Sequence, residues 1–365
     1  MNYQQALKDN EISKFEDVSK FLEANNIRVK QDTSVPELYL VYFSREGRDY
    51  DELSPLQREC NGAIYEKDTN KLVCACFDKF NKDSINPEAM FKLDDEELNI
   101  VDSVNGTFIR IYNYNGKQYF ATKKCINADH AYWSSKKSFG TMFQECLANK
   151  PQFEFDPQYN YFFVMQHPEN QSIFQINKTE LFHISTYNLV KNKYIVQYIG
   201  FYKPKVVSVR DRPTLDILIA KKTINNEGYI LYKNDGIGRI HQKIVFPSYK
   251  ERCELYGNTK LRFFRFLEIQ NDIDKVKQYL EKFPHHKDVF YDFEQQLLGF
   301  CKNLHETYLN IRVKRIENYN YDKKLGKCLY NLHGQYLKTH QPITLKTVTD
   351  YVRPLDAKLL MYLLR

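Results

Sequence analysis

The spacing of apolar residues changes abruptly near Gly257, and this change is what most constrains the fold of the chain. Between residues 38 and 257, short apolar runs of strand length alternate with turn residues. After Gly257, apolar residues recur at steps of three and four, which places them on one face of a helix. The strand candidates do not alternate with long helices, so an antiparallel sheet is favoured over a parallel, doubly wound one. The sequence therefore predicts an α+β domain of residues 1–256, followed by an all-helical domain of residues 257–365.

Individual segments of the first domain carry their own signals. Short helices are predicted within residues 4–24. Two β-rich segments flank Asn115-Gly116 and predict a hairpin over residues 108–122, because this dipeptide accepts the two positive φ angles of a type I′ turn. The other strand candidates are apolar runs, at residues 38–43, 161–165, 181–184, 229–232 and 243–246.

The helical domain is predicted to contain three helical stretches. The apolar residues from Phe266 to Phe283 predict a single helix, which Pro284 ends. Those from Phe290 to Ile311 predict a second helix, and by their spacing the aromatic residues of both should form core. His285-His286 is interpreted as a loop. The tail, residues 330–364, is predicted to be helical and broken at its two prolines.

The net positive charge lies in the same C-terminal region. Residues 257–365 hold 19 Lys and Arg against 12 Asp and Glu, whereas the first 256 residues hold 34 of each. The net charge of +7 therefore belongs to the predicted helical domain. A basic excess favours contact with phosphate backbones, although a solvated surface can carry the same excess.

Other features of the composition bear on the compartment. No apolar run approaches the roughly 18 residues that a membrane span requires, and the first 21 residues are polar and of mixed charge, unlike a signal peptide. The eight cysteines form no CxxC pair. We expect a reduced, soluble, cytoplasmic protein without membrane contact.

Several short stretches, taken in order, carry the strongest functional signal. They are Arg58-Glu59-Cys60-Asn61-Gly62-Ala63-Ile64-Tyr65, Phe77-Asp78-Lys79-Phe80-Asn81, Ser103-Val104-Asn105-Gly106-Thr107, Ala121-Thr122-Lys123-Lys124-Cys125, Phe163-Val164-Met165-Gln166-His167-Pro168-Glu169-Asn170, Asn226-Glu227-Gly228-Tyr229-Ile230 and Lys243-Ile244-Val245-Phe246-Pro247-Ser248-Tyr249. Together they resemble the phage-type RNA ligases of the covalent nucleotidyltransferase superfamily, whose relatives include DNA ligases and mRNA capping guanylyltransferases. Each match is weak alone, and their order along the strand candidates makes the resemblance specific. It implies that residues 1–256 form an antiparallel-sheet nucleotidyltransferase domain.

The departures from the family pattern bear on catalysis. In the family, a motif lysine attacks the α-phosphate of ATP and forms a lysyl-adenylate. The matching position here is Ser103, whose hydroxyl lacks comparable basicity, and no dedicated base is evident beside it. Val164 and Val245 replace an acidic residue and a second lysine of the family, while Glu227 and Lys243 are retained. Three losses on one reaction coordinate predict a pseudoenzyme, so no catalytic residue is assigned. An engineered serine alone would not explain the two valines.

A pocket can outlast the chemistry it once served. The resemblance implies contacts to a nucleotide or an RNA 5′ end from Arg58, Asn105, Lys123, Glu227 and Lys243. An mRNA cap is an attractive ligand, because a cationic methylated guanine stacks well on aromatic rings. The helical domain would add phosphate contacts or dock a protein partner. Such a role requires no cofactor beyond a purine nucleotide as ligand, and Mg²⁺ only if the protein is catalytic.

Two alternatives remain open. One is an active ATP-dependent RNA ligase that uses a non-standard lysine. Lys92 is the nearest imitation of the motif, but it lacks the motif glycine and precedes an acidic run. The other is a protein-interaction scaffold, in which Glu227 is only a carboxylate at a strand edge. His167 and His241 have no second ligand at metal spacing, so no metal site is predicted. The many Asn, Lys, Ile and Tyr residues are typical of an AT-rich genome, such as that of a large DNA virus.

Overall fold

The structure is a computed structural model of the 365-residue chain. It describes residues 3–43, 53–77, 98–133, 135–148, 150, 153–170, 173–195, 197–206, 217, 227–233 and 240–365. The chain divides into two compact units, Met1–Lys250 and Glu251–Arg365. Helix α7 (Pro247–Tyr256) begins in the first unit, and its Leu255 packs in the core of the second. The domain boundary predicted at residue 256 lies at the end of this helix.

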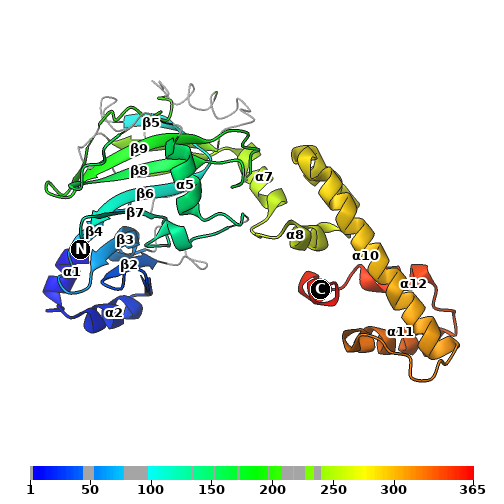
Figure 1. Cartoon of the computed structure of the whole chain (residues 1–365). Coiled ribbons are helices and arrows are strands. Elements are labelled where there is room, and N and C mark those ends of the chain that lie inside the picture. The colour runs from blue at the N-terminus through cyan, green and yellow to red at the C-terminus, as the bar shows by residue number, and fades with distance from the viewer. Residues whose placement is uncertain are drawn as a thin grey trace. The chain divides into compact units, whose positions relative to one another are not determined.

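The described residues of the first unit form three antiparallel sheets (Figure 1). Their strand orders are β1-β2-β3-β4, β10-β9-β8-β6-β7 and β12-β11-β5. The strands are Ile27–Gln31 (β1), Leu38–Phe43 (β2), Asn61–Glu66 (β3), Leu72–Cys74 (β4), Leu98–Ser103 (β5), Thr107–Tyr114 (β6), Lys117–Ala121 (β7), Tyr159–Gln166 (β8), Glu180–Asn188 (β9), Lys193–Ile195 (β10), Gly228–Lys233 (β11) and Ile240–Val245 (β12). Pairing between neighbouring strands is antiparallel throughout these sheets, which confirms the predicted α+β class.

Strands β6 and β7 form the hairpin that Asn115-Gly116 predicts. Both turn residues have positive φ angles, 49° and 72°, as a type I′ turn requires. Tyr114 pairs with Lys117 directly across the turn. Because β6 also pairs with β8, the hairpin lies within the five-stranded sheet. The preceding segment, residues 103–107, therefore reaches the sheet at the start of β6, where Thr107 pairs with Met165.

Short helices accompany the sheets of the first unit. Helices α1 (Tyr3–Asp9) and α2 (Phe15–Ala24) confirm the helices predicted at the N-terminus. Helix α3 (Pro55–Glu59) follows, and the 3₁₀ turn η2 spans Ala128–His130. Helix α5 (Phe139–Ala148) covers one face of the five-stranded sheet, where its buried residues join a core that includes residues of β6 and β8 (Figure 1).

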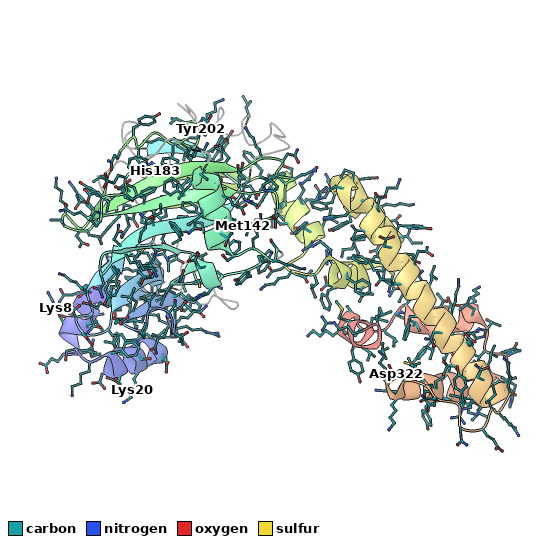
Figure 2. The ribbon with its side chains drawn as sticks, in the orientation of Figure 1. Lys8, Lys20, Met142, His183, Tyr202 and Asp322 are labelled. Atoms are coloured by element: carbon teal, nitrogen blue, oxygen red, sulfur yellow. The ribbon has the colours of Figure 1, made fainter. Side chains whose placement is uncertain are left out.

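The second unit is helical, as predicted. Its elements are α8 (Arg262–Ile269), α9 (Ile273–Lys282), the 3₁₀ turn η3 (Pro284–His286), α10 (Lys287–Tyr308), a π-helical turn η4 (Leu309–Val313), the 3₁₀ turn η5 (Lys323–Leu325), α11 (Gly326–Thr339), α12 (Leu345–Val352) and α13 (Ala357–Leu363). One apolar cluster holds them together, and it includes most of the aromatic residues predicted to be core. Figure 2 shows the side chains of both units.

The single helix predicted from Phe266 to Phe283 is wrong, because two helices replace it. Asp272 ends the continuity: its carboxylate accepts a hydrogen bond from the Lys275 N–H at 2.9 Å and caps α9. Ile273, which the apolar spacing placed in the core, has 69% of its surface exposed. Apolar residues can keep a spacing of three and four across the boundary between two helices, because the cap that starts the second helix is a local polar contact.

Three smaller expectations can also be compared with the structure. His285-His286 lies in a 3₁₀ turn, and His286 is buried with its Nδ1 atom 2.9 Å from the Tyr279 hydroxyl, so the loop interpretation is wrong. All eight cysteines are free thiols. Within the described ranges, no helix combines the length and apolarity needed to cross a bilayer.

Candidate nucleotide-binding site

Ser103, Glu227 and Lys243 meet on the three-stranded sheet. Ser103 at the end of β5 lies opposite Gly228 of β11, which in turn lies opposite Val245 of β12. Residues opposite each other on antiparallel strands share a face, and Lys243, two positions before Val245, shares it too. Glu227 directly precedes Gly228. Strand pairing therefore brings together Ser103 and Glu227, which lie 124 positions apart in the sequence.

One carboxylate joins the other two side chains. The Ser103 hydroxyl donates a hydrogen bond to Glu227 Oε2 at 3.0 Å, and Lys243 Nζ donates to Oε1 of the same carboxylate. Ser103 is 2% exposed, and the side chains of Lys243 and Glu227 are 12% and 18% exposed. The sequence spacing did not reveal this carboxylate as the partner of Ser103, because it is the pairing of β5 with β11 that brings Glu227 beside it. We call these three residues the Glu227 bridge.

Gly228 lets the strands approach closely next to this bridge. Its φ angle is +151°, and a Cβ atom at this position would lie 1.8 Å from the carbonyl oxygen of Ile244. The Glu227 carbonyl accepts a hydrogen bond from the Phe246 N–H at 3.1 Å on the same strand pair. The close approach at Gly228 and this hydrogen bond fix the backbone of Glu227, and they thereby position its side chain.

The turn after Ser103 rests on β8. Asn105 donates to the Tyr249 hydroxyl at 2.8 Å, and its carbonyl accepts from Gln166 Nε2 at 2.8 Å. An added Cβ on Gly106 would lie 2.5 Å from the Met165 carbonyl oxygen and 2.7 Å from Val164 Cγ1. The motif glycine is thus required by packing, and the valine that replaces the family's acidic residue fills the space beside it.

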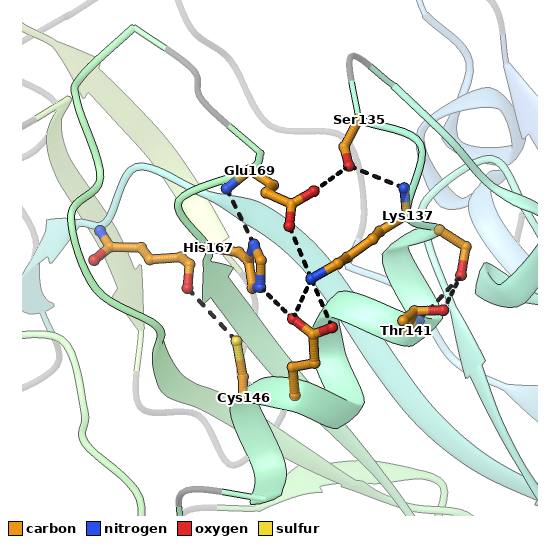
Figure 3. Close-up of polar contacts among 9 residues, drawn as sticks. Ser135, Lys137, Thr141, Cys146, His167 and Glu169 are labelled. Carbon is orange, nitrogen blue, oxygen red and sulfur yellow. Dashed lines mark hydrogen bonds and ion pairs between the residues drawn. The ribbon is translucent and has the colours of Figure 1, made fainter.

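A charged network braces the loop that follows β8 (Figure 3). His167 is 4% exposed; its Nδ1 atom accepts from the Glu169 N–H at 3.1 Å, so Nε2 carries the proton and donates to Glu145 at 2.9 Å. Lys137 Nζ lies 2.8 Å from a carboxylate oxygen of both Glu145 and Glu169. Hydrogen bonds from Lys137 hold the pKa of both carboxyl groups below the usual range. The histidine is a buried, hydrogen-bonded residue of α5's contact with this loop.

Arg58 and Lys123 lie on other elements of the first unit, in α3 and in the turn after β7. Arg58 lies on α3, and β3 follows with Gly62, where a Cβ would lie 2.4 Å from the Lys123 carbonyl oxygen. The buried Arg110 donates to the neighbouring Thr122 carbonyl at 2.7 Å. These contacts fix the backbone of the Lys123 turn and leave the Lys123 side chain exposed. Of the six sequence-predicted positions, the described contacts bring Ser103, Glu227 and Lys243 together, with Asn105 in the turn that follows Ser103.

Sequence reasoning missed Tyr249, Gln166 and the Lys137 network as parts of the site. The first two lie inside stretches that match the family motifs, so the signal was present although neither residue was assigned a role. Residues 78–81, Lys92 and Asn226 belong to motif or alternative readings of the sequence and lie outside the described residues.

The donor set does not suit a metal ion. The bridge contains a single carboxylate, that of Glu227. Mg²⁺ sites use near-octahedral oxygen coordination, commonly through carboxylates, waters and substrate phosphates. Among the described residues, no group of three or more His, Cys, Asp or Glu could hold a metal ion.

The chain has similarities of low identity to known proteins. No family model matches the chain. A curated relative, an immediate-early protein ICP-46 homologue of Invertebrate iridescent virus 6, is 22% identical over 316 residues, covering 77% of this chain and 68% of the relative. An archaeal ATP-dependent RNA ligase is similar in structure with a TM-score of 0.46 and 12% identity, over 77% of this chain and 78% of that one. An RNA ligase mutant of Naegleria gruberi with ATP and Mn gives a TM-score of 0.34 and 8% identity, over 46% of this chain and 56% of that one.

These similarities are low in identity, so a function has to be inferred from the residues of the chain itself. The match to the Naegleria ligase spans little more than half of that protein, and what these ligases bind is a property of theirs. The order of its motifs resembles that of the RNA ligases of the covalent nucleotidyltransferase superfamily, and Ser103 occupies the position of the motif lysine.

Proposed function

We propose that the chain binds an RNA 5′ end or a purine nucleotide without forming a covalent intermediate. One observation carries the proposal: the position that matches the nucleophile holds a buried hydroxyl that donates to Glu227, which also binds Lys243. A lysyl-adenylate needs an amine with a free lone pair at this point. The bridge instead presents a hydroxyl and a neutralised pair of charges, which favours recognition over transfer.

The surroundings of the bridge favour a base as part of the ligand. Asn105 holds the hydroxyl of Tyr249, whose ring centroid lies 5.5 Å from that of Phe174. Aromatic rings beside hydrogen-bonding groups suit a purine, and a cationic methylated guanine gains a further cation–π attraction. We propose an mRNA cap as the preferred ligand, with Glu227 accepting from donor groups of the ligand and Lys243 contacting phosphate.

The first test looks for covalent chemistry. The protein is incubated with radiolabelled ATP or GTP and with Mg²⁺ or Mn²⁺, then denatured in acid and separated by electrophoresis. We expect no labelled protein. A labelled adduct that mass spectrometry maps to a lysine, Lys92 among them, would replace this proposal with an active ligase. The variant Ser103→Lys restores an amine and is expected to remain unlabelled, because Val164 and Val245 also depart from the family pattern.

The second test measures binding. Fluorescence anisotropy compares RNAs of one sequence that carry a methylguanosine cap, a triphosphate or a hydroxyl at the 5′ end. Glu227→Gln and Lys243→Met should each weaken capped-RNA binding about tenfold, as expected for loss of a hydrogen bond to a charged group. Glu154→Gln, which changes an exposed carboxylate of the same unit, is the matched control. Equal, weak binding of all three RNAs would instead support a protein-interaction scaffold.

A further inference from the structure

An aromatic ladder runs along α11 of the second unit. His333, Tyr336 and His340 are spaced by three and four residues, and Tyr308 joins them from the end of α10. The ring centroids of successive members lie 6.2, 5.8 and 6.5 Å apart, and the planes of His333 and Tyr336 differ by 21°. Tyr308 is buried, while Tyr336 is 38% exposed and His340 is exposed. The ladder therefore starts in the core and reaches the surface.

Basic residues lie at the inner end of this ladder. Helix α10 passes into the π-helical turn Leu309–Val313, and π-helical turns are frequent at functional sites. Arg312, Lys314 and Arg315 are all exposed there. Burial raises the pKa of Tyr308, Tyr336 raises it further, and the guanidinium of Arg312 opposes that rise, so the guanidinium acts on the tyrosine that begins the ladder.

The sequence shows that charge follows the same region. Residues 305–340 hold 7 Lys and Arg against 3 Asp and Glu, so this segment accounts for +4 of the +7 of residues 257–365. Exposed aromatic rings beside a basic surface are the combination that binds single-stranded nucleic acid, since bases stack on the rings and phosphates contact the cations. An exposed ring without neighbouring charge would lack the second half of this combination.

We propose that His333, Tyr336, His340, Arg312, Lys314 and Arg315 form a binding surface for single-stranded RNA. Bases stack on Tyr336 and its imidazole neighbours, and the three cations contact the phosphates. This surface reads no 5′ end and lies in a unit different from that of the Glu227 bridge, so it does not depend on the function proposed for the bridge.

The test uses the full chain and a 3′-labelled oligouridylate with a 5′-hydroxyl, which offers neither cap nor terminal phosphate. Loss of one stacking ring in Tyr336→Leu should weaken binding about fivefold or more. Tyr336→Phe keeps the ring and should bind within about twofold of wild type. Tyr291→Leu changes another exposed tyrosine of the same unit, 64% exposed on α10, and should bind as wild type does.

Salt dependence separates a phosphate contact from a general effect of charge. Removing one contact to a single strand lowers the slope of log K against log salt by about 0.7. We expect this change in Arg312→Ala and not in Lys302→Ala, which removes an exposed cation earlier on α10. The helical content of each variant is checked by circular dichroism.

Three results would overturn the proposal. Tyr336→Leu could bind as tightly as wild type while remaining folded, or Tyr291→Leu could lose as much affinity as it does. Polyglutamate could compete as well as RNA does, which would assign the surface to an acidic protein. Because the probe has no 5′ phosphate or cap, each of these results leaves the proposal for the Glu227 bridge standing, and failure of that proposal leaves this one.

Discussion

The cations on which the two proposals rest differ in solvent exposure between the two units. In the first unit, Arg110 is 0% exposed and donates to two carbonyl oxygens, and the Lys243 side chain is 12% exposed on the Glu227 carboxylate. In the second unit, Arg312 and Arg315 lie exposed beside an aromatic ladder. The first 256 residues are neutral overall, and the net charge lies in the remainder.

This difference separates two ways of recognising a nucleic acid. A buried charge has lost its hydration and is tolerated where hydrogen-bond partners satisfy it, so it defines a fixed geometry. An exposed charge keeps its hydration and is screened by salt, so it contributes attraction that does not depend on geometry. We therefore expect the first unit to determine what is bound and the second to hold the strand. Paired substitutions, one in each unit, can break or sharpen this contrast.

Glycines should give the largest difference between the units. Gly228→Ala places a Cβ within 1.8 Å of the Ile244 carbonyl oxygen at a φ angle of +151°, so it should destabilise the first unit by about 3 kcal/mol or more. Gly299→Ala on α10 meets nothing within 4 Å and should stabilise the second unit by up to about 1 kcal/mol.

Each unit has its own spectroscopic probe for this pair. The one tryptophan of the sequence, Trp133, reports guanidinium unfolding of the first unit by its fluorescence, and circular dichroism at 222 nm follows the helical unit. Unfolding midpoints that shift equally for both variants would contradict the idea that close strand approach at the bridge is specific to the first unit.

Acidification should reveal a smaller effect that the two units share. Burial lowers the pKa of His183 in the first unit to about 4, and burial likewise lowers that of His286 in the second to about 4. An unfolded histidine titrates near 6.5, so between pH 6.5 and 4 the unfolded state binds more protons and stability falls as pH falls. The loss in each unit should reach up to about 3 kcal/mol at pH 4 and be absent above pH 7.

His183→Gln isolates the contribution of one unit. Glutamine keeps a polar group near the Thr186 hydroxyl, which lies 3.0 Å from His183 Nε2, and cannot take up the proton. Tryptophan-detected unfolding of this variant should vary less between pH 6.5 and 4 than that of wild type, while the helical unit keeps its wild-type pH dependence. An unchanged pH dependence of the first unit would mean that its carboxylates, and not His183, set its acid sensitivity.

The two units also differ in how far their sequences predict them. The hairpin at Asn115-Gly116 follows from its turn residues, because the required φ angles are a property of that dipeptide. The break between α8 and α9 does not follow from apolar spacing, since Ile273 continues that spacing although Asp272 caps a new helix. Local polar contacts decided a boundary that hydrophobic periodicity could not detect.

The site illustrates a different limit. Motif order identified Ser103, Glu227 and Lys243 as related positions, but the hydrogen bond between Ser103 and Glu227 depends on the register of β5 against β11, 124 residues apart. The brace from Lys137 to the loop after β8 was not predicted, because Lys137 and Glu145 match no motif and meet that loop through packing of α5 on the sheet. Residue types predict candidates, and strand register decides their partners.

Ion pairs provide the third comparison. Lys243→Met leaves the Glu227 carboxylate largely buried without its cation and should destabilise the first unit by about 2 kcal/mol. Arg353→Met removes the pair with Glu294 in the second unit, where both side chains are close to one third exposed, and should cost about 1 kcal/mol. Guanidinium unfolding of each variant at 0.1 and 1 M NaCl measures both effects. Only the Arg353 pair should weaken in salt; salt sensitivity of the Lys243 pair would mean that its charges are accessible to solvent.

Helix caps should give the smallest difference and a near-equal effect in the two units. Asp272→Ala removes the acceptor for the Lys275 N–H and should cost the second unit about 1 kcal/mol. Ser54→Ala removes the capping box that starts α3, just before Arg58, and should cost the first unit about the same.

Hydrogen exchange read by mass spectrometry resolves both helix starts in one experiment. Faster exchange at α9 in Asp272→Ala, without change at α3, is the expected pattern. If α9 exchanges at its wild-type rate, the break after α8 is held by the hydrogen bonds of Gln270 and Asn271 to the Arg353 carbonyl instead of by the cap, and Gln270→Ala should then speed exchange there.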